Sequence, residues 1–122
     1  MDKLIIHEEN VEGVVVLKLS GIIDSGTAQF LEDAFNELIA SNSVRIVADL
    51  SDVNYISSAG WGIFVGEIKG IRQRGGDIKL MAMHPDVREV FELLEFSTLL
   101  RPYGTLEEAI SAFKAPQNTK TS

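Results

Sequence analysis

Cysteine is absent from the 122-residue chain, which also has only three prolines, two histidines and one tryptophan. Without cysteine the chain can form no disulfide, no thiolate metal site and no cysteine nucleophile. The two histidines, His7 and His84, lie far apart in the sequence and follow no metal-ligand spacing. We therefore expect no metal and no cofactor.

Long apolar runs and basic clusters are missing as well. No apolar run approaches the roughly 20 residues that a membrane-spanning helix needs, and the first residues lack the layout of a signal peptide. The net charge of −7 disfavours nucleic-acid binding, and Lys69, Arg72 and Arg74 are predicted to form the solvated side of one helix. We expect a cytoplasmic protein with no membrane insertion and no nucleic-acid partner.

The common catalytic motifs are also absent. The sequence has no G-x-x-x-x-G-K-[ST], no G-x-G-x-x-G and no G-x-S-x-G. Neither histidine lies in a motif near Ser58, so that serine has no evident base, and the acidic residues indicate no general acid/base pair. The chain is therefore predicted not to be an enzyme.

Apolar residues make up 45% of the chain, enough to build one hydrophobic core. We expect residues 1–114 to form a single domain. Residues 115–122, APQNTKTS, offer no core side chain beyond Ala115 and are predicted to be a disordered tail.

In the first half of the chain, apolar patterns predict strands over Leu4–Glu9 and Val14–Leu19, joined by a short link that favours an antiparallel hairpin. Residues 20–26 contain two glycines with Asp and Ser and predict an irregular turn. Apolar residues spaced three and four apart then predict an amphipathic helix over Thr27–Ala40.

In the second half, Val44–Leu50 is predicted to be a buried strand that ends in a polar turn at Asp49–Asp52, followed by a strongly apolar helix. A further strand is expected at Ile78–Met83, then a helix that begins at His84–Asp86. A last short strand is expected over Phe96–Pro102, ended by Pro102, followed by a helix that begins with a Thr105/Glu108 capping box.

Two strands separated by a helix require a parallel pairing with a right-handed crossover. The predicted fold is therefore α/β, with a mixed and mostly parallel sheet of four to five strands, an initial antiparallel hairpin and about four helices.

Ser57 and Ser58 lie where the central strand passes into the buried helix. In open α/β sheets this junction is where ligands usually bind, and the free N–H groups of the helix point there. One interpretation is helix capping, for which serine is well suited, although a cap needs only one hydroxyl. The other is that a hydroxyl here carries a phosphate.

Asp24 and Trp61 each have two interpretations. Asp24 either steadies the turn before the first helix or offers a carboxylate at the same sheet edge as Ser58. Trp61 either packs in the core or is an exposed anchor for a partner. Glycines at 60, 62, 66 and 70 in the same helix indicate either close backbone packing or a surface that must stay low.

Three stretches in register resemble the STAS-domain family, and specifically the bacterial anti-sigma factor antagonists. The stretch Leu19–Asp24 is similar to the family's L-x-G-x-[IL]-D, and Val47–Val53 is similar to its V-x-D-L-S-x-[VL]. The stretch Tyr55–Gly62 is similar to [YF]-[ILM]-[DS]-S-[SAT]-G-L-G. The resemblance covers roughly residues 4–113.

The resemblance implies a phosphorylation-controlled switch. Unphosphorylated, such a protein binds an anti-sigma factor that is itself a serine kinase, and so releases the sigma factor. A serine/threonine phosphatase resets the switch. By position the phosphoacceptor is Ser58, with Ser57 as second choice. The implied partner-binding residues are Asp24, Ser57, Ser58, Ala59, Gly60 and Trp61.

Two positions depart from the family pattern: Ser57 replaces a frequent Asp, and Trp61 replaces the usual Leu. The alternative function is a STAS scaffold or transport-accessory subunit that is not phosphorylated. We expect a monomer.

Overall fold

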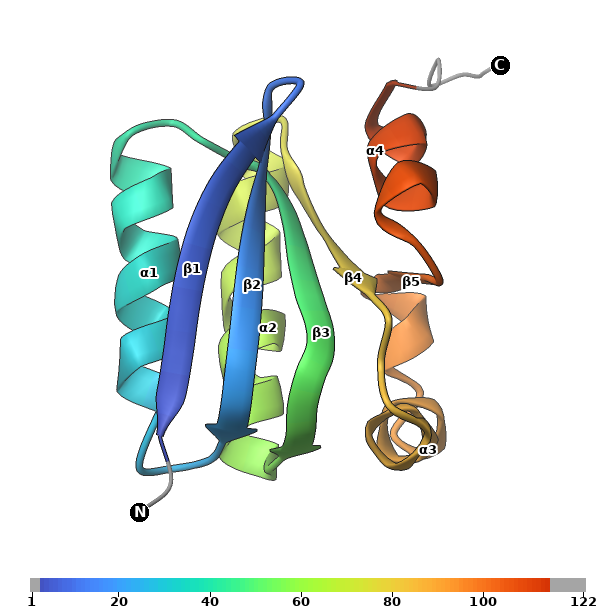
Figure 1. Cartoon of the computed structure of the whole chain (residues 1–122). Helices are drawn as coiled ribbons and strands as arrows, with labels where there is room; N and C mark the ends of the chain where they lie inside the picture. Colours follow the sequence, from blue (N-terminus) through green and yellow to red (C-terminus); the bar gives the residue numbers. More distant parts are fainter. Residues whose placement is uncertain (1–2, 115–122) are drawn as a thin grey trace.

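The computed structural model describes residues 3–114, which form a five-stranded sheet in the order β1-β2-β3-β4-β5. The β1 and β2 strands are antiparallel, and every other neighbouring pair is parallel. The expected tail, 115–122, lies outside the described residues. The predicted α/β fold is confirmed, and Figure 1 shows how the helices lie against the sheet.

The N-terminal hairpin joins β1 (Leu4–Val11) to β2 (Val14–Ile23) through a two-residue turn. Glu12 and Gly13 both have positive φ, 55° and 85°, as the tightest hairpin turns require. The β2 strand continues four residues beyond the predicted end at Leu19. The irregular turn expected from residue 20 is wrong there, because residues 20–23 pair with β3.

The central strand β3 (Arg45–Ile56) is also longer than predicted, and the expected polar turn at Asp49–Asp52 is wrong. The polar residues lie within the strand, where Ser20 pairs with Asp52 and Ile23 pairs with Ile56. Leu50, Val53 and Ile56 are buried while the residues between them are mostly exposed. This extension carries the end of β3 to the same level as the end of β2.

Helices cover the two faces of the sheet unequally. The α1 helix (Ala28–Ala40), α2 (Ser58–Gln73) and α3 (Pro85–Leu93) enclose the larger core, which contains Phe35, Phe64 and Phe91. Within the described residues, α4 (Leu106–Lys114) alone covers the other face, over a smaller cluster with Val16 and Val47. None of the helices in residues 3–114 is long and apolar enough to cross a membrane.

The last third of the domain differs from the prediction at one strand. The β4 strand (Asp77–Met81) and α3 lie near their predicted positions, with His84 at the N-cap of α3 and Pro85 in its first turn. Residues Phe96–Thr98, however, form a short 3₁₀ helix, η1, and β5 is Arg101–Tyr103. Pro102 is tolerated inside β5 because this strand pairs only with β4 and forms the edge of the sheet.

Helices α1 and α2 place two carboxylates together. Partial burial raises the pKa of Glu67, and the charge of Glu32 raises it further. A raised pKa means that the folded state binds the proton more readily than the unfolded chain. At pH values above the folded pKa, ionised Glu67 therefore lowers the free energy of unfolding. This loss of stability disappears below about pH 4.

We expect Glu67→Gln to raise stability at neutral pH by at most about 0.5 kcal/mol, because Glu67 is only partly buried and solvent screens its charge. Thermal melts at pH 7 and in acid would show the gain shrinking as the pH falls below about 4. Glu37→Gln, at an exposed position of α1, is the control. An equal gain at both pH values would contradict this account.

Candidate functional site

The ends of β2 and β3 bring the predicted site residues together at one edge of the sheet (Figure 1). The backbone N–H of Ser57 donates to the carbonyl oxygen of Ile23 at 2.8 Å. Ile23 and Ile56 are register partners at the ends of β2 and β3. Asp24 comes directly after β2, and Ser57 and Ser58 come directly after β3. The structure therefore places Asp24 and the two serines side by side at the start of α2.

Ser57 and Ser58 have different local roles. Ser57 is the N-cap of α2, and its Oγ accepts a hydrogen bond from the N–H of Gly60 at 3.2 Å. Ser58 is the first helical residue and is exposed, and its hydroxyl makes no hydrogen bond to any residue in 3–114. The capping interpretation holds for Ser57 and leaves the Ser58 hydroxyl available for chemistry.

This division predicts different stabilities for the two alanine variants. Ser57→Ala should lower the free energy of unfolding by about 0.5–2 kcal/mol, since it removes the cap. Ser58→Ala should change it by less than about 0.5 kcal/mol, because an exposed, unbonded hydroxyl is lost. Denaturant titration of both variants checks this, and a larger loss in Ser58→Ala would assign the cap to Ser58.

Trp61 belongs to the core, and the interpretation of its side chain as an exposed partner anchor is wrong. Its side chain is only 1% exposed. Its ring lies 5.2–5.7 Å from those of Phe64, Phe91 and Phe96, which joins α2 to α3 and η1. Tryptophan replaces leucine here as a larger packing residue, and its indole Nε1 has no hydrogen-bond partner within the described chain.

Asp24 has the structural role that the sequence allowed. Its Oδ1 accepts hydrogen bonds from the N–H of Gly26 at 2.9 Å and of Thr27 at 3.2 Å. These bonds fix the turn that leads into α1. Within residues 3–114, Oδ2 accepts no hydrogen bond, and Asp24 is only half-buried. One carboxylate oxygen thus holds the turn while the other remains available to a partner.

Two exposed aromatic side chains lie at this edge and were missed from the sequence. Tyr55, near the end of β3, is 54% exposed, and Phe30, in the first turn of α1, is 58% exposed. A signal existed for Phe30, because it lies off the apolar stripe made by Leu31, Phe35 and Leu38. Exposed aromatic residues are common anchors in protein interfaces.

The start of α2 can accept negative charge. The first N–H groups of a helix have no intrahelical acceptor, and the helix dipole is positive at that end. The Gly60 N–H is bonded to Ser57, and no acidic residue lies in the first turn. No group of metal-ligating side chains occurs among residues 3–114. The edge has the features of a contact surface with a modifiable hydroxyl.

Comparisons with known proteins identify the family of the domain. Residues 6–109 match the STAS domain. The anti-sigma-F factor antagonist RsfB of Mycobacterium tuberculosis is 30% identical over 115 residues, which are 93% of this chain and 92% of RsfB.

Solved structures show the same architecture. A crystal structure of an anti-sigma factor antagonist from Mycobacterium paratuberculosis superposes with a TM-score of 0.84 at 28% identity, covering 92% of this chain and 95% of that one. The unphosphorylated form of SpoIIAA, an anti-sigma factor antagonist, superposes at 0.70 with 22% identity over 92% of this chain and all of its own, a likeness of fold. The chain therefore belongs to the STAS-domain family, among the anti-sigma factor antagonists.

Proposed function

We propose that this protein is a phosphorylation-controlled partner switch in the cytoplasm and that Ser58 is its phosphoacceptor. The unphosphorylated form binds an anti-sigma factor serine kinase and so frees the sigma factor. Phosphorylation of Ser58 ends this binding, and a serine/threonine phosphatase restores it. The observation that carries the proposal is the exposed, unbonded Ser58 hydroxyl beside Ser57, whose own hydroxyl is engaged in capping α2.

The proposed contact surface is the edge formed by Asp24, Ser57, Ser58, Ala59 and Gly60, extended by Phe30 and Tyr55. Gly60 has no side chain and is buried against Ile23, so it lets the start of α2 lie close to β2 and offers the partner little exposed area. Trp61 supports the surface from below and does not touch the partner. The exposed aromatics supply apolar contact area, and Oδ2 of Asp24 supplies an acceptor.

A phosphate on Ser58 would add a charge of about −1.5 to −2. The N-terminus of α2 tolerates that charge, so the fold need not change. A partner surface shaped for the bare hydroxyl and facing Asp24 would meet both a bulkier group and like charge. Binding is therefore lost through steric and charge conflict rather than through refolding.

The test is phosphorylation by the host's anti-sigma factor kinase, followed by peptide mass spectrometry. Wild type and Ser57→Ala should incorporate phosphate on Ser58, and Ser58→Ala should incorporate none. Phosphate on Ser57 in the wild type would move the acceptor by one residue. No incorporation in any variant would favour the alternative function, a scaffold or transport-accessory subunit.

A further inference from the structure

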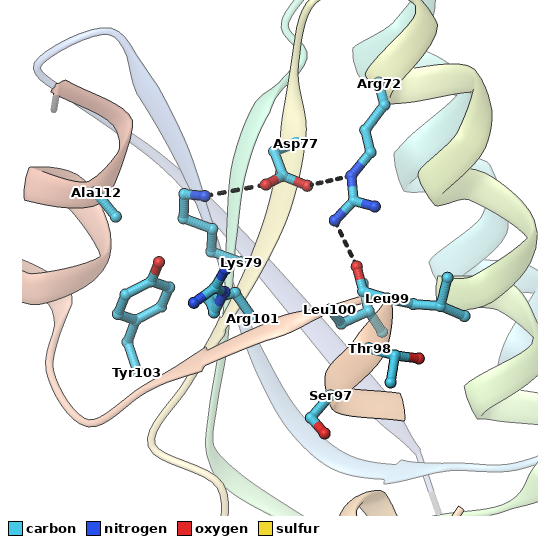
Figure 2. A pocket seen from close by; sticks show the side chains of 10 residues that line it. All are labelled: Arg72, Asp77, Lys79, Ser97, Thr98, Leu99, Leu100, Arg101, Tyr103 and Ala112. Carbon is cyan, nitrogen blue, oxygen red and sulfur yellow. Dashed lines mark hydrogen bonds and ion pairs between the residues drawn. The ribbon is translucent and has the colours of Figure 1, made fainter. Parts of the chain in front are cut away.

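A cleft lies far from Ser58, at the β4–β5 edge of the sheet. Its volume is about 550 Å³, and its lining combines the end of α2, η1, β4, β5 and α4. Arg72, which lines the cleft, is 14 residues along α2 from Ser58, or about 21 Å at 1.5 Å per residue. Figure 2 shows the side chains around this cleft.

The cleft is rich in positive charge although the whole chain carries −7. Arg72, Lys79 and Arg101 line it with one carboxylate, Asp77. An adjoining cleft shares Arg72, Asp77 and Lys79 and adds Arg45. Three cations therefore face one carboxylate in the first cleft, and the second adds a fourth cation without another acid.

The carboxylate of Asp77 is already occupied. Its Oδ1 accepts from Arg72 Nε at 3.0 Å, and its Oδ2 accepts from Lys79 Nζ at 3.0 Å, as the dashed lines in Figure 2 show. The N–H of Ile78 also donates to Oδ1 at 2.9 Å. Asp77 shares one negative charge between two cations and forms no ion pair with Arg101.

Lys79 is unusual for a lysine because it is only 8% exposed, and its side chain lines this cleft. Burying a charge costs free energy unless an opposite charge pairs with it. Lys79 shares its one carboxylate partner, Asp77, with Arg72. The rings of Phe113, at 4.5 Å, and Tyr103, at 5.8 Å, offset part of this cost through cation–π contacts. The two rings carry no net negative charge that could balance the lysine.

Arg101 adds a like charge directly beside Lys79. The two residues are register partners on β4 and β5, so their side chains leave the same face of the sheet. Like charges at paired positions are destabilising. Among residues 3–114, Arg101 has no ion-pair partner. An anion bound between Arg101 and Lys79 would remove this repulsion.

We propose that this cleft binds the phosphate group of a small molecule, between Arg101, Lys79 and the Tyr103 hydroxyl. Arginine and lysine are the usual phosphate-binding side chains, and a tyrosine hydroxyl can donate a hydrogen bond. The volume is that of a small-molecule site, which favours a compact ligand over a macromolecule. The site is independent of the Ser58 switch and gives the domain a second input.

The test is calorimetric titration of the full chain with inorganic phosphate, pyrophosphate and phenyl phosphate, at constant ionic strength set by chloride. We expect saturable binding that is tighter for pyrophosphate than for phosphate. Arg101→Gln, which breaks no described ion pair, should weaken pyrophosphate binding by at least about tenfold. Arg88→Gln, at an exposed position of α3, removes the same charge elsewhere and should leave binding within about twofold.

Phenyl phosphate separates two sources of the ligand. If phenyl phosphate binds more tightly than inorganic phosphate, the ligand is assigned as a phosphorylated metabolite. If the two bind equally, the ligand is assigned as free phosphate. Absence of saturable binding at millimolar concentrations of all three probes would overturn the proposal. An equal loss in Arg101→Gln and Arg88→Gln would also overturn it, since the effect would then be one of net charge.

Discussion

Ser58→Asp should weaken binding of the chain to its anti-sigma factor kinase by at least about 100-fold, while Ser58→Ala should bind within about threefold of wild type. Like charge and an unpaired carboxylate in an interface cost several kcal/mol, and each 1.4 kcal/mol is a factor of ten in affinity. Titration calorimetry with the purified kinase measures both constants. This prediction rests on the proposed function.

The same variant separates a surface conflict from a conformational change. An acidic residue in the first turn of a helix is stabilising by about 0.3–1 kcal/mol. Ser58→Asp should therefore melt no lower than wild type although it fails to bind. Ser111→Asp, on the exposed side of α4, carries the same substitution on the other face of the sheet and should bind normally.

Tight binding by Ser58→Asp would contradict the switch. A large fall in its melting temperature would contradict the account of phosphorylation without refolding, because lost binding would then follow from lost structure. Normal melting with lost binding in both Ser58→Asp and Ser58→Ala would show that the hydroxyl itself is needed for contact.

The sequence predicted the order and type of most elements because apolar spacing is a local property. Prediction from the sequence failed where strand pairing determines the structure. Residues 20–23 and 49–52 look like turns because glycine and acidic residues are poor strand formers. In the fold Asp49 pairs with Lys18, and residues 20–23 pair with residues 52–56, so both strands continue through these segments. The pairing joins positions about 30 residues apart along the chain, beyond any local pattern.

The site shows the same limit. The position of the serines at the start of a helix could be predicted, but a sequence with two adjacent serines does not say which one caps. Only the geometry assigns the cap to Ser57. Burial of Trp61 depends on Phe91 and Phe96, which lie 30 or more residues later in the chain. The cationic cleft depends on the pairing of β4 with β5, and β5 was predicted at the wrong residues.

Among the glycines of α2, Gly60 is the one that packs closely against the ends of β2 and β3. A Cβ atom there would lie 2.6 Å from Ile23 Cγ2, 2.8 Å from the Ile23 carbonyl oxygen and 2.9 Å from Ile56 Cγ2. The carbonyl cannot move aside freely, because it accepts the hydrogen bond from Ser57 that joins β2 to the start of α2. At positions 62, 66 and 70 a Cβ would meet nothing within 4 Å.

We expect Gly60→Ala to lower the free energy of unfolding by about 3 kcal/mol, which is about 10 °C in melting temperature for a domain of this size. The clash exceeds the gain of about 0.5–1 kcal/mol that alanine brings to a helix. Gly62→Ala, two residues later and exposed, is the matched control and should show only that gain. Equal stability of the two variants would mean that the start of α2 can move away from Ile23. The fixed position of Asp24 beside Ser58 would then lose its structural basis.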